Sequence, residues 1–451
     1  MLIDIKNVGK VSNAHIEING ITVMGGVNNT GKSTIGKMLF CIVNSLYKFD
    51  EQVEQERNNR LFKIIKALID GDAFPSSMKR NINHPENHES YLWFVPNVAF
   101  NKMTSNNMIY SKIFNDKTKI DKELRALLNR TDIDYGKNLS DADIKEATAN
   151  ISHIMEISDN SILTSVFLQM LQAEFNMQIN NINKPDLESR VALEQNGNVA
   201  KVNIRENEHI EIEDGFSFEN NAIYLDDPLI LDNDPLILDR TIGQRNIENP
   251  KPHREHLLQF LYKNSKNAPI AIAFDEALAK KKLDGVLSKL DSVCNGELVS
   301  TPKTRDAMIA YRAFGSATEL DIKNVSTGIK TFALLKRLLF NGSLKENGIM
   351  ILDEPEIHLH PEWQLVFAEI IVLLHKEYNI RFLLNTHSPY FLDAITVFSE
   401  KHGITKKCKY YLAEDTEGFA STTDVTDNIE KLFEKLAMPL QTLENERYKD
   451  D

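Results

Sequence analysis

The stretch Gly26-Val-Asn-Asn-Thr-Gly31-Lys32-Ser33-Thr34 most constrains what this chain can fold into. It matches the pattern G-x-x-x-x-G-K-[ST]; an apolar, β-rich segment at 21–24 precedes it, and helical spacing of apolar residues follows from Ile35. A strand that leads into a glycine-rich loop and then a helix directs backbone N–H groups and the positive helix end at one place. The sequence therefore predicts a phosphate-binding loop.

The polar residues of this loop have distinct expected roles. Lys32 is expected to reach the β- and γ-phosphates of a nucleotide, and the Ser33 hydroxyl to bind Mg²⁺. The residues expected to bind the nucleotide are Gly26, Asn28, Asn29, Thr30, Gly31, Lys32, Ser33 and Thr34. The structural alternative is a glycine-rich turn that merely starts a core helix, and the strand–loop–helix context argues against it.

Composition excludes some classes of protein and leaves others open. Of the 451 residues, 42% are hydrophobic and 26% charged, which is typical of a globular chain, and no apolar run is long enough to span a bilayer. The N-terminus lacks the pattern of a signal peptide, and the three cysteines show no C-x-x-C spacing. We therefore expect a cytoplasmic protein without disulfides or a zinc site.

The net charge of −13 disfavours nucleic acid at long range, but it does not exclude a local basic patch. The densest candidates are Lys280–Lys282 and the cluster Lys406, Lys407 and Lys409. Short clusters of this kind are more often solvated helix faces or loops. Charge alone therefore leaves direct DNA binding open.

A second motif block begins at Gly348, where an apolar strand ends in Asp353-Glu354-Pro355. Opposite a phosphate loop, Asp353 is expected to bind Mg²⁺ and Glu354 to polarise the attacking water. The alternative is a buried strand that ends in a turn with two solvated acids. Pairing with the phosphate loop favours the catalytic interpretation.

One strand further along, an apolar segment ends in Thr386-His387-Ser388-Pro389. A neutral imidazole at this place can hydrogen-bond a γ-phosphate or a water molecule, so His387 is the second expected catalytic residue. For His358 and His360, a functional role and a role in shaping the turn remain equally open. Upstream, Ser326-Thr-Gly328 precedes a helix, either as a second anion site or as an ordinary helix cap.

The order of these motifs resembles the ABC-type ATPase heads of the SMC-like and OLD-like families. Within that group, Asp353–Pro361 and Thr386–Pro389 look like the OLD-like bacterial ATPases, many of which belong to anti-phage defence systems. The resemblance covers residues 1–47 and 313–395 well. In those families the Ser-x-Gly element is the signature motif, and here Ile329 replaces the polar residue that usually follows it.

The resemblance implies an α/β fold, namely an ABC-type P-loop ATPase head with a mixed sheet and an antiparallel β-subdomain, interrupted by a mainly helical insertion. The expected parts are an N-terminal ATPase lobe at 1–47, a helical insertion at 48–189, a β-meander and returning strand at 190–245, a second helical part of the insertion at 246–312, and a C-terminal ATPase lobe at 313–451. A local duplication, Asp227–Asp232 and Asp234–Asp239, has no mechanism that the sequence reveals.

The resemblance also implies that two heads pair head to tail around ATP. Ser326 and Gly328 of one copy would then bind the nucleotide held by the other copy. The glutamine of the Q-loop is not evident, and Gln169 and Gln172 are the candidates.

OLD-like nucleases carry a Toprim domain after the ATPase, and the residues after Pro389 offer only a strand and a helix. We therefore expect an ATPase that senses or regulates a separate effector, a nuclease or toxin, in a bacterial anti-phage system. One alternative is an SMC/RecF-like DNA-repair or DNA-maintenance ATPase that binds DNA directly. Another is a nucleotide-gated scaffold without turnover, which Glu354 and His387 argue against.

Overall fold

The computed structural model describes residues 1–70, 110–130, 140–232, 251–262, 281–301 and 308–447. The chain divides into two compact units. The first comprises Met1–Tyr47, Phe167–Gln244 and Pro250–Asp451, and the second comprises Lys48–Val166 and Arg245–Asn249. Across the described ranges, no helix is both long enough and apolar enough to cross a membrane.

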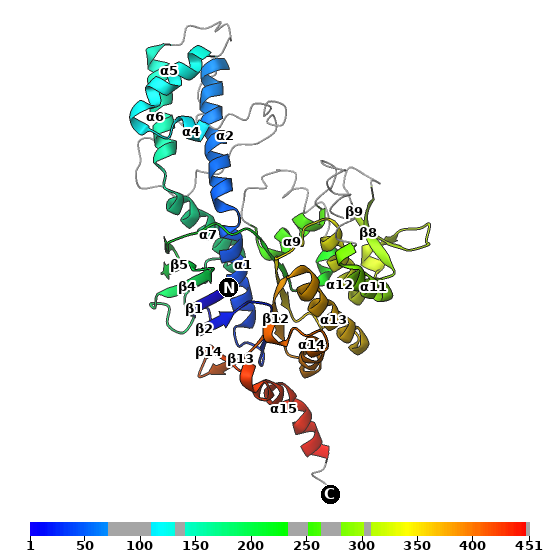
Figure 1. The fold of residues 1–451 in the computed structure, drawn as a ribbon. Helices are drawn as coiled ribbons and strands as arrows, with labels where there is room; N and C mark the ends of the chain where they lie inside the picture. Colours follow the sequence, from blue (N-terminus) through cyan, green and yellow to red (C-terminus); the bar gives the residue numbers. More distant parts are fainter. Residues whose placement is uncertain (71–109, 131–139, 233–250, 263–280, 302–307, 448–451) are drawn as a thin grey trace. The chain divides into compact units, whose positions relative to one another are not determined.

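A mixed sheet forms the centre of the first unit, with the order β6-β5-β4-β1-β2-β14-β13-β3-β12-β11-β7 (Figure 1). Its parallel strands are β13 (Cys408–Thr416), β3 (Ile21–Gly25), β12 (Arg381–Thr386), β11 (Ile349–Asp353) and β7 (Ala222–Leu225). β3, β11 and β12 are near-continuous apolar runs because both of their faces are covered.

The remaining strands form the antiparallel part of the same sheet. They are β6 (His209–Glu213), β5 (Asn198–Arg205), β4 (Ser189–Gln195), β1 (Leu2–Val8) and β2 (Val11–Glu17). β14 (Phe419–Asp424) joins the two parts, because it pairs antiparallel with β13 and parallel with β2. The predicted fold class, with its mixed sheet and antiparallel β-subdomain, is confirmed.

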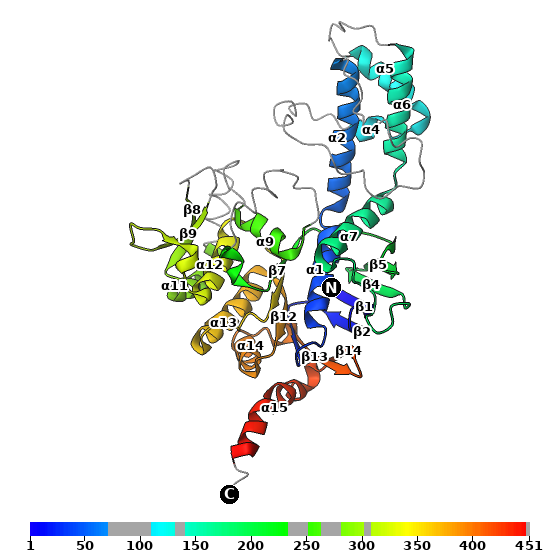
Figure 2. The ribbon, with the colours of Figure 1, turned by 180° about the vertical axis from the view of Figure 1, so that it is seen from behind.

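Helices cover both faces of the parallel strands. Met350 and Leu352 of β11 join the core formed with α12, α13 and α14, whereas Ile351 faces Gly36 of α1. This alternation follows from the two-residue period of a strand. The helices concerned are α1 (Lys32–Leu46), α12 (Thr327–Phe340), α13 (Pro361–Tyr378) and α14 (Pro389–Lys401). Figure 2 shows α11, α12, α13 and α14 close together; α11 contacts α12 and α13, and α13 contacts α14.

The second unit is helical, and it has a core of its own. Leu61, Phe114, Leu124 and Ile151 are buried together in it. Its helices are α2 (Phe49–Asp70), α4 (Tyr110–Ile113), α5 (Ile120–Arg130) and α6 (Asp141–Glu156). The last of these begins at a capping box in which Ser140 and Asp143 satisfy each other's backbone amides. The chain leaves this unit through α7 (Asp159–Phe175).

A second helical part of the insertion was predicted at 246–312, and the described helices and strands of this range lie elsewhere. The helices α9 (His253–Tyr262) and α11 (Asp284–Val293) belong to the first unit, where Leu257 and Leu287 share its core. The strands β8 (Gly296–Thr301) and β9 (Met308–Ala313) form a small sheet with β10 (Leu320–Asp321). Helical periodicity predicts that one face is buried but not what buries it, which explains the difference.

Three smaller predictions can be located in this fold. Cys41, Cys294 and Cys408 are buried and unpaired by disulfides. The first copy of the duplication forms the 3₁₀ helix η3 (Pro228–Asp232), whereas Asp234–Asp239 lies outside the described residues. Lys280 also lies outside them, and Lys409 pairs with Glu17 on β2 at 3.1 Å.

Candidate active site

The candidate site lies where three parallel strands end. β3, β12 and β11 are neighbours, and their register pairs Gly25 with Thr386 and Asn385 with Asp353. The carboxyl ends of parallel strands meet at one edge of a sheet, which is the usual place for a ligand in such folds. The loops that leave this edge carry Gly26–Thr34, Glu354 and His387, so the sheet brings the predicted residues together.

The phosphate loop folds around its own lysine. Lys32 is only 4% exposed, and its Nζ lies 3.1 Å from the Gly26 carbonyl, 2.9 Å from the Val27 carbonyl and 3.3 Å from Thr30 Oγ1. Burial lowers the pKa of Lys32 to about 8, although the charges of Glu354 and Asp353 act in the opposite direction. An ammonium group held in this way can exchange neutral carbonyl partners for an anionic phosphate.

The glycines of the loop are required by geometry. A Cβ on Gly26 would lie 2.2 Å from the Ala413 carbonyl oxygen, and Gly31 adopts a φ of +80°, which disfavours other residues. Gly31 is the N-cap of α1 and offers no side chain to it, so the first backbone N–H groups of the helix are not capped from that residue. Ser33 is exposed at this entrance.

The two acids at the end of β11 are held differently. Asp353 accepts a hydrogen bond on each oxygen, from Tyr224 Oη and from Asn385 Nδ2, both at 2.8 Å. Glu354 adopts a φ of +52°, an uncommon conformation for a residue other than glycine, and its N–H donates to the Asn385 carbonyl at 2.9 Å. Backbone strain of this kind is concentrated at functional sites.

His387 and Glu354 form a close pair. His387 Nε2 lies 2.8 Å from Glu354 Oε1. Burial and the nearby Lys32 charge lower the pKa of His387 below its ordinary value, although Glu354 acts in the opposite direction. The lowered pKa favours the neutral ring, and Nε2 is the nitrogen that faces the Glu354 carboxylate. The structure thus brings together the two residues predicted to be catalytic.

The Ser-x-Gly element stands at a second helix entrance. Ser326 is the N-cap of α12, but its exposed hydroxyl makes no capping hydrogen bond. Gly328 packs under an indole ring, because an added Cβ would lie 2.8 Å from Trp363 Cζ3. Among the contacts of the described residues, none joins Ser326 to the phosphate loop or to Glu354 of the same chain.

A family model for an AAA ATPase domain matches residues 1–392 of the chain. The chain belongs to this ATPase family. The matched domain is of the type that binds and hydrolyses ATP.

Two curated relatives match a shorter part of this AAA ATPase. It is 36% identical over 106 residues to the probable ATPase of retron Vc95 of Vibrio cholerae serotype O1 biovar El Tor, covering 21% of this chain and 20% of the relative. It is 36% identical over 98 residues to the probable ATPase of retron Ec83 of Escherichia coli, covering 19% and 18%. The matched parts thus span about a fifth of the length of each relative.

Solved SMC heads also align with this AAA ATPase over most of its length. A SmcHead bound to the C-winged helix domain of ScpA gives a TM-score of 0.42 at 11% identity, covering 95% of this chain and 98% of the other. The SMC head domain from Thermotoga maritima gives 0.37 at 10% identity, covering 94% and 98%. The fold class rests on the sheet and on the family match.

One residue of the site in this ATPase was not assigned a role from the sequence. Glu356 is 5% exposed, and its Oε1 accepts hydrogen bonds from Thr386 Oγ1 at 2.5 Å and from the His387 N–H at 3.2 Å. Burial raises the pKa of Glu356. Glu356 thus fixes the backbone that carries His387, and the only signal in the sequence was a third acid in Asp-Glu-Pro-Glu.

The structure shows where the residues whose roles were left open are located. His360 is the N-cap of α13, where its Nδ1 accepts from the Glu362 N–H at 3.4 Å. His358 Nε2 lies 3.9 Å from Asp227 Oδ1, so both histidines contact the turn and its surroundings. The Q-loop candidates Gln169 and Gln172 lie within α7, and Asp226 rather than a glutamine follows the end of β7.

Proposed function

We propose that two copies of this ATPase bind ATP between them, head to tail, so that each site combines residues of both chains. The observation that most supports this proposal is at the N-terminus of α12, where the exposed Ser326 hydroxyl makes no hydrogen bond to its own helix. A helix N-terminus with an available hydroxyl is suited to bind phosphate. Ser326 and Gly328 of one copy then bind the nucleotide held by the other.

Within one chain, the remaining groups have separate tasks. The loop amides and Lys32 bind the phosphates, Glu354 accepts a proton from the attacking water, and neutral His387 donates a hydrogen bond to the reacting groups. A neutral imidazole has one N–H, so His387 donates it to Glu354, 2.8 Å away, before ATP binds and to the reacting groups once ATP is bound.

Mg²⁺ fits the donor groups at this edge. Among the described residues, no group of three or more His, Cys, Asp or Glu side chains could hold a metal ion by itself. Mg²⁺ commonly binds through one or two carboxylates together with phosphates and water, so one carboxylate suffices. We propose that Asp353 and Ser33 hold it, and that it neutralises phosphate charge when bound.

Apolar side chains near the site support a protein partner at this edge. Val27 in the phosphate loop, Ile357 after the acids and Tyr390 after the histidine are 48%, 60% and 43% exposed. All three follow the carboxyl ends of adjacent parallel strands. Exposed apolar groups around a polar site are suited to a contact that excludes water.

In the cell, we propose that ATP-dependent closure of this pair regulates a separate effector, a nuclease or toxin, in a bacterial anti-phage system. The support is the match to two ATPases named for retrons, together with the resemblance to the OLD-like group. The described segments after His387, which are α14, β13, β14 and α15 (Glu430–Arg447), belong to the ATPase unit.

Glu354→Gln tests the ATP-dependent pair. The variant should bind ATP and sediment as a dimer with ATP and as a monomer with ADP, while turnover falls about 100- to 10,000-fold because the general base is lost. Glu362→Gln, on an exposed acid of α13, is the matched control and should behave like the wild type. Unchanged hydrolysis by Glu354→Gln would refute the assignment of the base.

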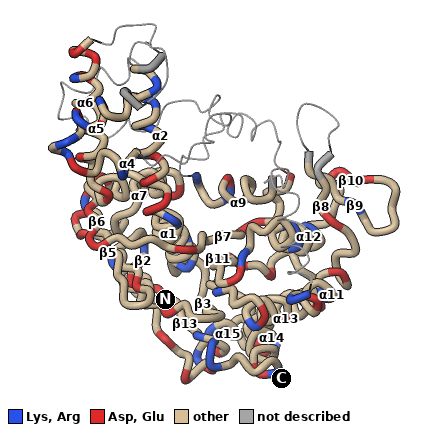
Figure 3. The backbone as a smooth tube through the Cα atoms, turned by 45° about the horizontal axis from the view of Figure 1, so that its top comes forward, with Lys and Arg blue, Asp and Glu red and all other residues tan. Residues whose placement is uncertain are grey.

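DNA is the partner under the main alternative. Figure 3 shows acidic and basic residues interspersed along the described backbone. We expect duplex DNA to change the ATPase rate little. A stimulation that falls steeply with rising salt would instead favour a DNA-maintenance ATPase.

The regulatory role is tested in cells that carry the gene within its native neighbourhood. When Lys32 is replaced by Ala, ATP binding is lost and protection should fail, so the plating efficiency of a phage panel should rise. In a separate experiment, the product of a neighbouring gene should co-purify with the wild-type protein. Full protection by the Lys32→Ala variant would contradict an ATP-dependent role.

A further inference from the structure

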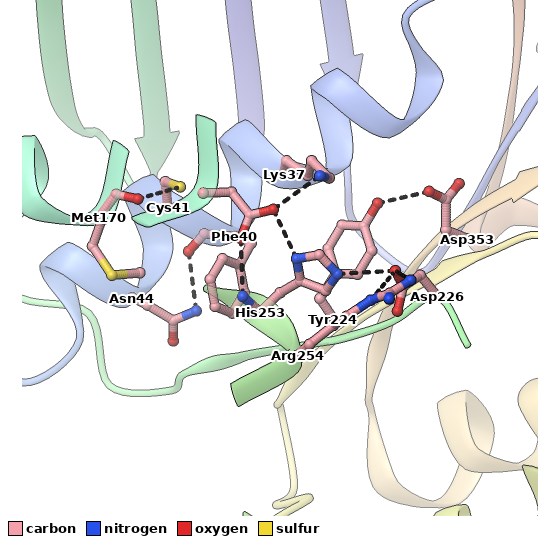
Figure 4. Close-up of polar contacts among 11 residues, drawn as sticks. Lys37, Phe40, Cys41, Asn44, Met170, Tyr224, Asp226, His253, Arg254 and Asp353 are labelled. Atoms are coloured by element: carbon pink, nitrogen blue, oxygen red, sulfur yellow. Dashed lines mark hydrogen bonds and ion pairs between the residues drawn. The ribbon is translucent and has the colours of Figure 1, made fainter. Parts of the chain in front are cut away.

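A cluster of polar side chains, buried except for Lys37, Asp226 and Arg254, lies next to the Asp353 carboxylate (Figure 4). It joins Lys37 of α1, Glu174 of α7, Tyr224 and Asp226 at the end of β7, and His253 and Arg254 of α9. Only Tyr224 of this cluster contacts the site, and ATP chemistry as proposed above assigns the other residues no task.

His253 is fixed between two carboxylates. Its Nδ1 lies 2.7 Å from Glu174 Oε1, its Nε2 lies 3.1 Å from Asp226 Oδ2, and its backbone N–H donates to Glu174 Oε2 at 2.9 Å. Burial opposes a charge on this ring, yet hydrogen bonds to Asp226 and Glu174 raise the pKa of His253. Lys37 and Arg254 bind the same two carboxylates, at 3.1 Å and 2.7 Å.

The histidine ring in turn holds the tyrosine ring. The centroids of His253 and Tyr224 are 4.5 Å apart, and Phe40 packs edge-on against both rings. Tyr224 is almost completely buried, and its hydroxyl donates to Asp353 Oδ2 at 2.8 Å. A carboxylate can only accept here, so the direction of this hydrogen bond is fixed.

Strand register explains why this cluster reaches Asp353. β7 and β11 run parallel, and Tyr224 pairs with Ile351, so Tyr224 lies next to the end of β11, where Asp353 shares the face of Ile351. Buried ion pairs add little net stability, because desolvation offsets their attraction. A fully hydrogen-bonded network does, however, hold its members in one arrangement. We therefore expect this cluster to hold its side chains in position rather than to stabilise the fold.

We propose that Tyr224 is a positioning residue for Asp353, and that His253, held by Glu174 and Asp226, sets where Tyr224 stands. The inference rests on the proposed function, in which Asp353 holds Mg²⁺. Groups that hydrogen-bond a metal ligand orient it, and their loss typically weakens metal affinity or activity about 10- to 100-fold.

The test is the Mg²⁺ dependence of ATP turnover by the full chain. Tyr224→Phe keeps the ring and removes the hydroxyl, so the Mg²⁺ concentration for half-maximal turnover should rise about tenfold. Binding of ATP without metal should not change. Tyr411→Phe is the matched control, because it removes a buried hydroxyl that accepts from the Glu17 N–H, and its Mg²⁺ dependence should equal that of the wild type.

His253→Gln should shift the Mg²⁺ dependence in the same direction. The double variant Tyr224→Phe/His253→Gln should match Tyr224→Phe alone if the histidine acts through the tyrosine. If His253→Gln fails to fold, the comparison of Tyr224→Phe with Tyr411→Phe still decides whether Tyr224 positions Asp353.

Asp353→Asn separates failure of the inference from failure of the proposed function. Loss of Mg²⁺-dependent turnover in Asp353→Asn together with a shifted Tyr224→Phe supports the inference. A Tyr224→Phe variant with wild-type Mg²⁺ dependence overturns the inference alone. An Asp353→Asn variant with wild-type Mg²⁺ dependence overturns the proposed metal ligand, and the inference with it.

Discussion

The entrances of α1 and α12 look alike in sequence but differ in what surrounds them. Both begin with small residues before a helix. At α1, the loop folds over Lys32, and the loops carrying Glu354 and His387 leave the same sheet edge. At α12, Ser326 exposes an uncapped hydroxyl, and no acid or histidine of the site contacts it among the described residues. The difference is what we expect if, as proposed, the second entrance completes a site on another copy.

The largest expected effect comes from filling the second entrance. Ser326→Arg should lower turnover at least about 100-fold, because a long cation at the N-terminus of α12 opposes the helix dipole and blocks phosphate. ATP binding by the single chain and the melting temperature should remain close to wild type. The matched control is Ser292→Arg, at another exposed serine, on α11. A fully active Ser326→Arg variant would show that the two entrances do not cooperate.

A smaller effect is expected at the first entrance, where Glu356 holds the backbone of His387. Glu356→Gln keeps the shape but weakens the acceptor for Thr386 Oγ1 and the His387 N–H. We expect kcat to fall about tenfold with KM for ATP little changed, since the geometry of a catalytic group is disturbed. A fall in kcat that is accompanied by a clearly lowered melting temperature would indicate a purely structural role.

The protonation of Lys32 gives the first entrance a pH dependence that the second lacks. The pKa of Lys32 is about 8, and phosphate binds the charged form. Above pH 8, binding of ATP must take up a proton, so affinity should fall by up to about tenfold per pH unit. Titration with a fluorescent ATP analogue between pH 7 and 10 measures this. A Lys32→Gln variant should bind ATP weakly, and its affinity should not fall further above pH 8. If the fall persists in this variant, another group causes it.

The smallest effect is expected at Gly328. A Cβ there meets the Trp363 ring, so Gly328→Ala should destabilise the fold by about 1–3 kcal/mol through overpacking. A gain in helix propensity of up to about 1 kcal/mol opposes this. Gly285→Ala in α11 meets open space and should stabilise the fold instead. Chemical denaturation distinguishes the two, and equal effects at both glycines would contradict close packing at Gly328.

Sequence reasoning located the parts of the site that are local in the chain. Gly26–Thr34 and His387 follow strands and Asp353 ends one, and each lies in a short sequence motif. The partners of these residues are not local, because Tyr224 meets Asp353 only through the register of β7 with β11. The burial of Glu356 likewise depends on contacts with β12. Such contacts are fixed by the folded sheet and leave no pattern in a single sequence.

The helical segments teach the same lesson. Composition predicted a helical insertion at 48–189, and the second unit covers Lys48–Val166 of that range. α9 and α11 have the same helical periodicity but pack in the core of the first unit. β14 was not predicted, because a short strand with mixed polarity is recognised only by its pairing with β13 and β2.

The most direct test of the composite site mixes two inactive variants. Lys32→Ala lacks the phosphate lysine, and Ser326→Arg lacks the second entrance, so each alone should have almost no ATPase activity. An equimolar mixture should recover about a quarter of the wild-type rate, since half of the random pairs contain both chains and one of their two sites is intact. A mixture as inactive as its components would contradict a site shared between two copies.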